Sequence, residues 1–253
     1  MSTPSDIKSE REQRFERARD EVLHGLQLDT GVGVLGERTL HAVLKRYYEP
    51  FEGSREVKLG RYIADIFGED GVVEIQTGSL YALRPKLDEF LQVTPVTVVY
   101  PMTARRKLIW VDQKSGERTE GGVARRHKPI DVFGELWKLE PFLDHPNFRL
   151  HLLMVDVDEY RAFSGYDKRG RRRRGERLDR VPNAILEEYH LERPEDYAAL
   201  CPENLPDEFG SSEFAAAAKI SRQAAQTALR VLFKLGVMTR EKSGNAYKYR
   251  FLW

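Results

Sequence analysis

One stretch constrains the fold more than any other: residues 61–77, in which two apolar runs flank the dipeptide Asp70-Gly71. Asp-Gly tolerates the positive φ angles of a type I′ turn, so the pattern predicts a β-hairpin with these two residues as its loop. Counting outward along an antiparallel ladder then places Asp65 opposite Gln76. The sequence therefore predicts a hairpin that brings an acid and an amide together.

The two faces of this hairpin differ in character. Side chains alternate between faces along a strand, so Asp65, Glu74 and Gln76 share one face. Three aliphatic residues take the other face: Ile66, Val73 and Ile75. Two carboxylates and a carboxamide are costly to bury without an ion or hydrogen bonds, and their oxygens suit a divalent cation. We therefore expect a cation site on the polar face.

Asp65 and the triplet Glu-Ile-Gln at 74–76 resemble the Asp…(Asp/Glu)-x-Lys signature of the PD-(D/E)XK nuclease superfamily. The resemblance covers residues 36–100. This sequence has Gln76 where the signature has lysine. Some members carry glutamine there, and others move the lysine to the following helix, where Lys86 is the candidate.

The resemblance also implies roles for these residues. Asp65, Glu74 and the backbone carbonyl of Ile75 would hold Mg²⁺ or Mn²⁺, and Gln76 or Lys86 would position the attacking water. In this superfamily a helix before the hairpin often supplies a further acid, which Glu37 resembles. The alternative for Glu37 is an acid that stabilises the helix dipole.

The order of elements agrees with this resemblance. A charged helix over 5–26 comes first, and the next helix, over 37–48, precedes the hairpin. A helix to about residue 91 and a β-branched strand over 96–100 follow the hairpin, which makes a right-handed crossover. We predict an α/β fold: a restriction-endonuclease-like mixed sheet flanked by helices, plus a C-terminal winged-helix domain.

Further elements are expected beyond residue 100. They are a strand over 108–111, a helix capped by Asp131, and a strand over 148–157. Three acids crowd the end of the last strand: Asp156, Asp158 and Glu159. They could form a second acidic site, but we favour a charged strand end.

The C-terminal residues resemble a winged helix-turn-helix. A short helix over 212–219, a turn at 220–221, a second helix that Ser221 caps and Gly236 ends, and a hairpin over 237–252 follow one another. Such domains place the second helix in the major groove and touch phosphates with the wing. The expected DNA contacts are Ser221, Arg222, Gln223, Gln226, Thr227 and Arg230 on the helix, and Arg240, Lys242, Lys248 and Arg250 on the wing. The alternative is a module that binds protein.

Positive charge is concentrated in two blocks. The net charge is +1, yet residues 160–182 and 212–253 each carry +6, which leaves about −11 elsewhere. The first block contains an arginine run suited to phosphate: Arg169, Arg171, Arg172, Arg173 and Arg174. A solubilising linker or a basic localisation signal is the alternative for this run. Clustered charge of this kind indicates a polyanionic partner, with nucleic acid first.

Composition sets further limits. The single cysteine, Cys201, excludes an internal disulfide and a cysteine-based zinc site, and it fits a cytoplasmic protein. No apolar run is long enough to span a membrane, and the N-terminus is too charged for a signal peptide. The expected domains are an N-terminal helix (1–30), the nuclease-like core (31–160), a basic then acidic connector (161–210), helical in part over 186–205, and the winged helix (211–253).

The leading interpretation is a metal-dependent DNA phosphodiesterase that its winged helix targets to DNA. The first alternative is a non-catalytic DNA-binding regulator or accessory protein on a degenerate nuclease core. An RNA-processing or RNA-binding protein is the third. A homodimer would suit the cutting of both strands, although no residue demonstrates one.

Overall fold

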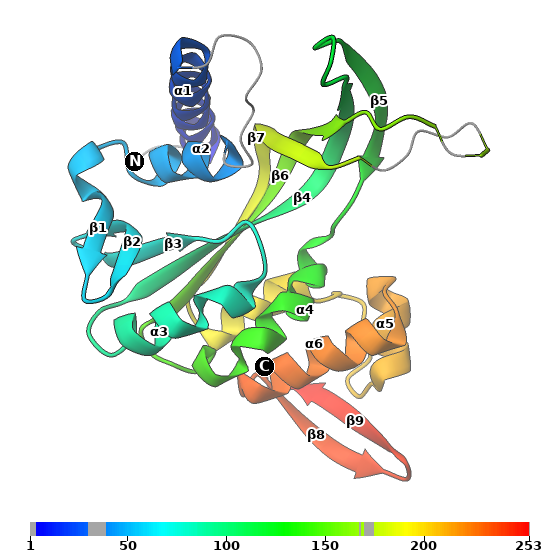
Figure 1. Ribbon diagram of the computed structural model, residues 1–253. Coiled ribbons are helices and arrows are strands. Elements are labelled where there is room, and N and C mark those ends of the chain that lie inside the picture. The colour runs from blue at the N-terminus through cyan, green and yellow to red at the C-terminus, as the bar shows by residue number, and fades with distance from the viewer. Residues whose placement is uncertain (1–3, 30–38, 167, 170–174, 253) are drawn as a thin grey trace. The chain divides into compact units, whose positions relative to one another are not determined.

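The computed structural model describes residues 4–29, 39–166, 168–169 and 175–252 (Figure 1). The chain groups into two compact units. The first comprises Met1–Lys58, Pro101–His127 and Leu153–Glu188, and the second comprises Leu59–Tyr100, Lys128–Leu152 and Tyr189–Trp253.

Two helices pack together in the first unit. They are α1 (Pro4–Asp29) and α2 (Thr39–Tyr48). Phe15, Ala18 and Val22 form one stripe of α1, because residues three and four apart share a helix face, and they pack against Val43 and Tyr47 of α2. The ring of Phe15 meets that of Tyr47 edge-on at 6.1 Å. Both helices predicted for this region are confirmed.

Strands complete the first unit. The elements and their bounds are η1 (Glu52–Ser54), β1 (Arg55–Leu59), β5 (Arg118–Arg125), and parts of β4 (Val96–Val111), β6 (Phe148–Ala162) and β7 (Arg177–Leu191). Their order is β5-β4-β6-β7, with β4 and β5 antiparallel.

A buried carboxylate fixes the start of α2. Asp179 of β7 is fully buried, and its Oδ1 accepts hydrogen bonds from the backbone amides of Thr39 (3.3 Å) and Arg180 (2.8 Å). Its Oδ2 accepts one from the Thr39 hydroxyl. Burial raises the pKa of Asp179, and the hydrogen bonds from Thr39 oppose that rise. Asp179 therefore satisfies orphan donors at this helix terminus.

The second unit holds a mixed sheet. β2 (Tyr62–Gly68), β3 (Gly71–Ile75) and the first residues of β4 and β6 lie in the order β2-β3-β4-β6. β2 and β3 are antiparallel, whereas β3 and β4 are parallel. The connection from β3 to β4 passes through η2 (Leu80–Leu83) and α3 (Arg84–Phe90). The predicted strand–helix–strand crossover is confirmed, and the sheet is mixed and flanked by helices.

A chain of short helices follows β5. They are η3 (Pro129–Val132), α4 (Phe133–Leu136) and η4 (Trp137–Phe142). The predicted helix is present but mostly 3₁₀, in part because Pro141 removes a backbone donor. The α4 segment contacts η2, and both α4 and η4 contact the C-terminal helix α6 (Arg222–Lys234). Figure 1 shows α4 beside α6.

The strands differ from the prediction in three places. Residues 96–100 and 108–111 belong to one sixteen-residue strand, β4, instead of two. Residues 118–125 form β5, which was not expected. Residues 177–191 form β7, which was not expected, whereas the partly helical character predicted for 186–205 is confirmed by η5 (Pro194–Leu200). Neither β5 nor β7 shows a regular alternation of apolar and polar residues, because Gly121-Gly122 interrupts β5 and Asp179-Arg180 and Pro182 interrupt β7.

The C-terminal residues form two helices and a hairpin. These elements are α5 (Ser211–Ala218), α6 (Arg222–Lys234), β8 (Met238–Ser243) and β9 (Ala246–Phe251). Ser221 caps α6 as predicted, since its hydroxyl accepts a hydrogen bond from the Ala224 amide at 3.1 Å. Phe233, near the C-terminal end of α6, is 37% exposed. Lys234, next to it, ion-pairs with Asp144 at 2.8 Å.

No helix within the described ranges is both long and apolar enough to cross a membrane.

Candidate functional site

The hairpin of β2 and β3 has a different register from the one predicted. Gly68 pairs with Gly71 and Ile66 with Val73, so the loop is Glu69-Asp70. Continuing that register places Asp65 opposite Glu74. The predictions of an Asp70-Gly71 loop and of Asp65 opposite Gln76 are therefore wrong. The shift is two residues, which leaves every side chain on its predicted face.

Gly71 explains the shift. Its φ is +99°, and a Cβ atom there would lie 2.3 Å from the backbone oxygen of Pro95. The next amide, that of Val72, donates to the same oxygen at 2.9 Å. Gly71 is thus needed where β3 enters its pairing with β4, and the two residues before it make the turn.

Asp65, Glu74 and Lys86 converge on the polar face. The Lys86 ammonium donates to both Glu74 carboxylate oxygens, at 2.9 and 2.7 Å, and to the Ile63 carbonyl at 2.7 Å. Asp65 Oδ2 accepts a hydrogen bond from the Ile75 amide at 2.8 Å. The Glu74 side chain is only 2% exposed and that of Lys86 is 26% exposed. Two acids and a lysine from three elements therefore meet in a nearly buried setting.

The charges in this group are coupled. Burial raises the pKa of Glu74, the ammonium of Lys86 opposes that rise, and the neighbouring Asp65 carboxylate adds to it. Both effects follow from elementary electrostatics, because desolvation and like charge disfavour ionisation while a cation favours it. A raised carboxyl pKa beside a second acid is typical of functional sites.

Gln76 lies at the edge of this group. Its side-chain amide donates to the Ser79 carbonyl at 2.6 Å, so it holds the loop that leaves β3. Lys86, from α3, is therefore the residue that approaches the carboxylates. Glu37, the predicted third acid, lies outside the described residues.

The residues predicted to read DNA bases divide into two groups along α6. Arg222, Gln223 and Gln226 are exposed at its N-terminal end. Arg230, further along, forms an ion pair with Glu140 at 2.7 Å, and its guanidinium lies 4.3 Å from the centre of the Trp137 ring. The N-terminal turns of α6 are thus open, and its later part is engaged within the unit.

Two predicted helix contacts also have local roles. The Ser221 hydroxyl is the α6 cap, and the Thr227 hydroxyl donates to the Gln223 carbonyl at 3.1 Å. Each hydroxyl is thus engaged by the helix itself, so the presence of these two residues can be explained without a contact to a DNA base.

Three of the four predicted wing cations have neighbours within the second unit. Arg240 lies between two rings, 4.1 Å from the centre of Phe233 and 4.8 Å from that of Tyr247. The remaining wing cations are placed as follows: Lys248 pairs with Glu213 at 3.3 Å, Arg250 pairs with Glu208, and Lys242 is exposed. In the arginine run, Arg171, Arg172, Arg173 and Arg174 lie outside the described residues, and Arg169 is exposed in a turn.

The three acids of the predicted strand end lie inside β6, which continues to Ala162, and Asp158 Oδ1 accepts a hydrogen bond from the Asn183 side-chain amide at 2.8 Å. Asp156 accepts a hydrogen bond from Arg105 Nε at 2.9 Å, and Glu159 pairs with Arg106 at 3.0 Å and Arg161 at 2.6 Å. The arginines help hold the pKa of Glu159 below its ordinary value against the opposing effect of burial. The charged strand end favoured from the sequence is therefore wrong, because the strand extends past these acids and their partners within the chain account for them.

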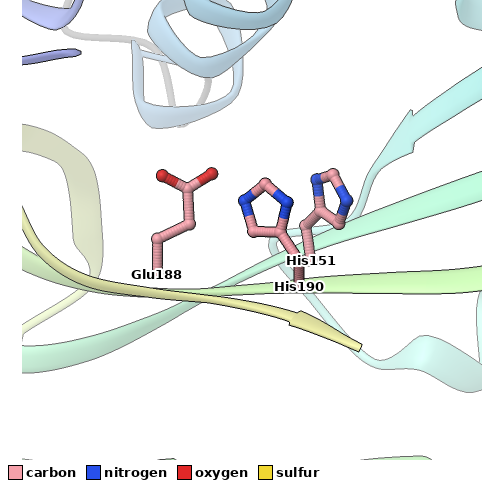
Figure 2. A group of neighbouring side chains, drawn as sticks. All are labelled: His151, Glu188 and His190. Atoms are coloured by element: carbon pink, nitrogen blue, oxygen red, sulfur yellow. The ribbon is translucent and has the colours of Figure 1, made fainter. Parts of the chain in front are cut away.

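A group not anticipated from the sequence lies on β6 and β7. His151 and His190 stack, with ring centres 3.9 Å apart and planes 24° apart, and Glu188 precedes His190 on β7 (Figure 2). Glu188 accepts a hydrogen bond from Arg11. Imidazole ligands favour zinc and other transition metals over magnesium, so this trio does not correspond to the predicted Mg²⁺ site. The two histidines are 39 positions apart, and only the strand pairing brings them together.

Comparisons with known proteins place the chain in a family. A relative from Treponema pallidum (strain Nichols), described as an uncharacterized protein, is 31% identical over 138 residues, which is 52% of this chain and 55% of that protein. The match thus spans about half the length of that relative. No solved structure matches the chain. The model of a family described as a domain of unknown function (DUF8091) matches residues 38–192, a range that includes Asp65, Glu74 and Lys86 and stops before α5. The chain belongs to this family.

Proposed function

We propose that the chain is a metal-dependent phosphodiesterase that cleaves DNA, with a restriction-endonuclease-like core and a winged-helix module at residues 211–253. The observation that carries this proposal is the convergence of Asp65, Glu74 and Lys86. These residues come from two strands and the following helix, in the order that the nuclease resemblance implies. The lysine missing from the triplet is supplied by α3.

The donor set fits a hard divalent cation. Carboxylate and carbonyl oxygens are the ligands that Mg²⁺ and Mn²⁺ prefer, and Asp65, Glu74 and the Ile75 carbonyl would provide them. Bound there, the ion would polarise the scissile phosphate and lower the pKa of the attacking water. The nearly buried position of Glu74 strengthens electrostatic interactions by excluding water.

Lys86 has the second role. Its ammonium, 2.7 Å from Glu74 in this structure, would turn to the phosphate oxygens as negative charge develops on them. In the hydrolysis, the water oxygen bonds to phosphorus, the bond to a sugar oxygen breaks, and the leaving oxygen takes up a proton. Gln76, which donates a hydrogen bond to the Ser79 carbonyl, would fix the conformation of the loop beside the site.

A second candidate is a non-catalytic DNA-binding protein on the same scaffold. The observation that favours it is the position of Lys86, because an ammonium on both Glu74 oxygens can neutralise that acid without any metal. In that case the hairpin would be structural, and α6 and the wing would carry the function.

The experiment that tests the proposal is a cleavage assay with single-stranded, duplex and branched DNA in Mg²⁺ or Mn²⁺. We expect cleavage by the natural sequence and its loss in Asp65→Ala and Lys86→Met. Asp70→Ala is the matched control, because Asp70 is an exposed acid in the turn of the same hairpin. Equal cleavage by all four proteins, or cleavage of none of these substrates, would refute the enzyme.

Calorimetry with Mn²⁺ separates the two candidates. The enzyme should bind the ion, and binding should disappear in Asp65→Ala but persist in Asp70→Ala. A natural sequence that neither binds Mn²⁺ nor cleaves, yet retains affinity for DNA, would establish the scaffold instead.

A further inference from the structure

Two large aromatic rings stand exposed in the second unit. Tyr81 in η2 is 61% exposed and Trp137 at the start of η4 is 41% exposed. η2 and η4 pack against each other. Exposed rings of this size cost free energy in water, so a surface that presents two of them is a candidate binding surface.

Each ring is met by an arginine. The guanidinium of Arg84 lies 5.3 Å from the centre of the Tyr81 ring, and that of Arg230 lies 4.3 Å from the centre of the Trp137 ring. Both distances fall in the range of cation–π attraction. Arg230 is itself 54% exposed, so its planar group extends the stack begun by Trp137. The result is planar, cationic surface of the kind on which nucleic-acid bases stack.

Hydrogen bonds connect this surface to the candidate catalytic group. Gln76, which follows Glu74 on the chain, donates to the Ser79 carbonyl at 2.6 Å, and Lys138 donates to the Ser79 hydroxyl at 3.1 Å. Lys138 directly follows Trp137. Glu135 fixes the same loop by accepting a hydrogen bond from the Leu80 amide at 2.9 Å. The loop that leaves β3 therefore links the carboxylates to the exposed rings.

We propose that Tyr81, Arg84, Trp137, Lys138 and Arg230, here termed the stacking strip, bind an unpaired nucleic-acid strand beside the candidate catalytic group. This inference rests on the proposed function and specifies its substrate: DNA with a single-stranded segment. In a duplex the bases stack on each other and hide their faces, whereas an unpaired strand offers them to protein rings. The three cations of the strip suit the phosphates of that strand.

The charge of the strip fits this occupant better than a peptide does. Its acidic neighbours are already paired: Glu140 with Arg230, and Glu135 with Lys138. The Arg230–Glu140 pair is exposed and therefore weak, so a phosphate can compete for the guanidinium. The rings, the cations and the neighbouring candidate catalytic group all suit a nucleic-acid strand.

The test measures binding without any metal, so that it does not depend on cleavage. Fluorescence anisotropy with labelled oligo(dT) in EDTA should show that the natural sequence binds the single strand more tightly than a blunt duplex of equal length. Tyr81→Ala and Trp137→Ala should each weaken oligo(dT) binding about tenfold, which is the usual value of one base–aromatic stack. Trp137→Phe should retain most of the affinity.

Phe51→Ala is the matched control, because Phe51 is 75% exposed and lies in the first unit. Unchanged oligo(dT) affinity in both Tyr81→Ala and Trp137→Ala would overturn the stacking strip, and so would a preference for duplex. Loss of affinity in Phe51→Ala as well would mean that any exposed ring contributes, which also overturns it. If oligo(dT) binds through the strip while no substrate is cut with Mg²⁺ or Mn²⁺, the phosphodiesterase fails and the stacking strip stands.

Discussion

Lys86→Met provides the most direct physical test of the candidate site. The change keeps the length and apolar stem of the side chain but removes the ammonium that contacts both Glu74 oxygens and the Ile63 carbonyl. Glu74, which is 2% exposed, would then keep a buried negative charge next to Asp65. We expect the variant to fold with reduced stability.

The magnitude follows from the burial of the pair. Removing one partner of a buried ion pair costs about 3–5 kcal/mol, because the other charge is left without compensation. The Lys86 side chain is 26% exposed, so water screens part of the interaction. We therefore expect the free energy of unfolding to fall by an amount near the lower end of this range, about 3 kcal/mol. This value applies at pH values well above those at which Glu74 is protonated.

The pH dependence has a definite sign. Burial already raises the pKa of Glu74, and losing Lys86 raises it further. A carboxyl whose pKa is higher in the folded state binds more protons there, so acidification favours folding. The loss of stability caused by the unpaired Glu74 carboxylate is complete above the pKa of Glu74 in the folded state. It vanishes below the pKa of glutamate in the unfolded chain, about 4.3. The stability difference between the variant and the natural sequence should shrink as the pH falls through this window.

The assay is urea unfolding followed by circular dichroism at a series of pH values. Lys58→Met, at an exposed lysine, is the matched control and should stay within about 0.5 kcal/mol of the natural sequence. Adding Glu74→Gln to Lys86→Met should recover much of the loss, because no buried charge remains. A difference below about 1 kcal/mol at every pH, or one that grows on acidification, would refute the proposed coupling.

Three further predictions concern other positions. Gly71→Ala should lower stability by at least about 2 kcal/mol in urea unfolding, because of its φ of +99° and the contact with Pro95, while Gly68→Ala, whose Cβ would meet nothing within 4 Å, should change it little. Asp179→Ala should cost about 2 kcal/mol by thermal unfolding, since buried donors at Thr39 lose their acceptor; a loss below about 0.5 kcal/mol would contradict that role. The affinity for Mn²⁺, measured by calorimetry, should be highest above the raised pKa of Glu74 and should fall as the pH drops through that pKa. The fall should occur at a higher pH than it would for an exposed glutamate. An affinity that does not change with pH would count against Glu74 as a ligand.

Patterns with a short period could be read from the sequence. The helices over 5–26 and 37–48, the helix that follows the hairpin and the Ser221 cap were all predicted correctly, because each depends on residues a few positions apart. The polar face of the hairpin was also assigned correctly, because strand alternation is insensitive to a shift of two residues.

Features that depend on partners far along the chain could not be read in this way. The turn position was wrong because Pro95, which precedes the neighbouring strand β4 and is 24 positions away, determines where Gly71 must lie. The strands β5 and β7 were missed because glycines, a proline and adjacent charged residues interrupt their apolar pattern, so only their pairing with neighbouring strands identifies them. The stack of His151 on His190 has no local signature at all.

The exposed end of α6 sets a limit on how much sequence information the module could extract. Arg222 to Gln226 span four helical steps, roughly 6 Å, which is less than two base-pair steps of about 3.4 Å each. Such a helix end would discriminate roughly two base pairs, a combination that recurs about once in every sixteen positions of random DNA. A single copy would therefore find matching sites almost everywhere in a genome. Its choice of target would have to come from the structure of the DNA, such as single-stranded or branched segments, and not from the base sequence.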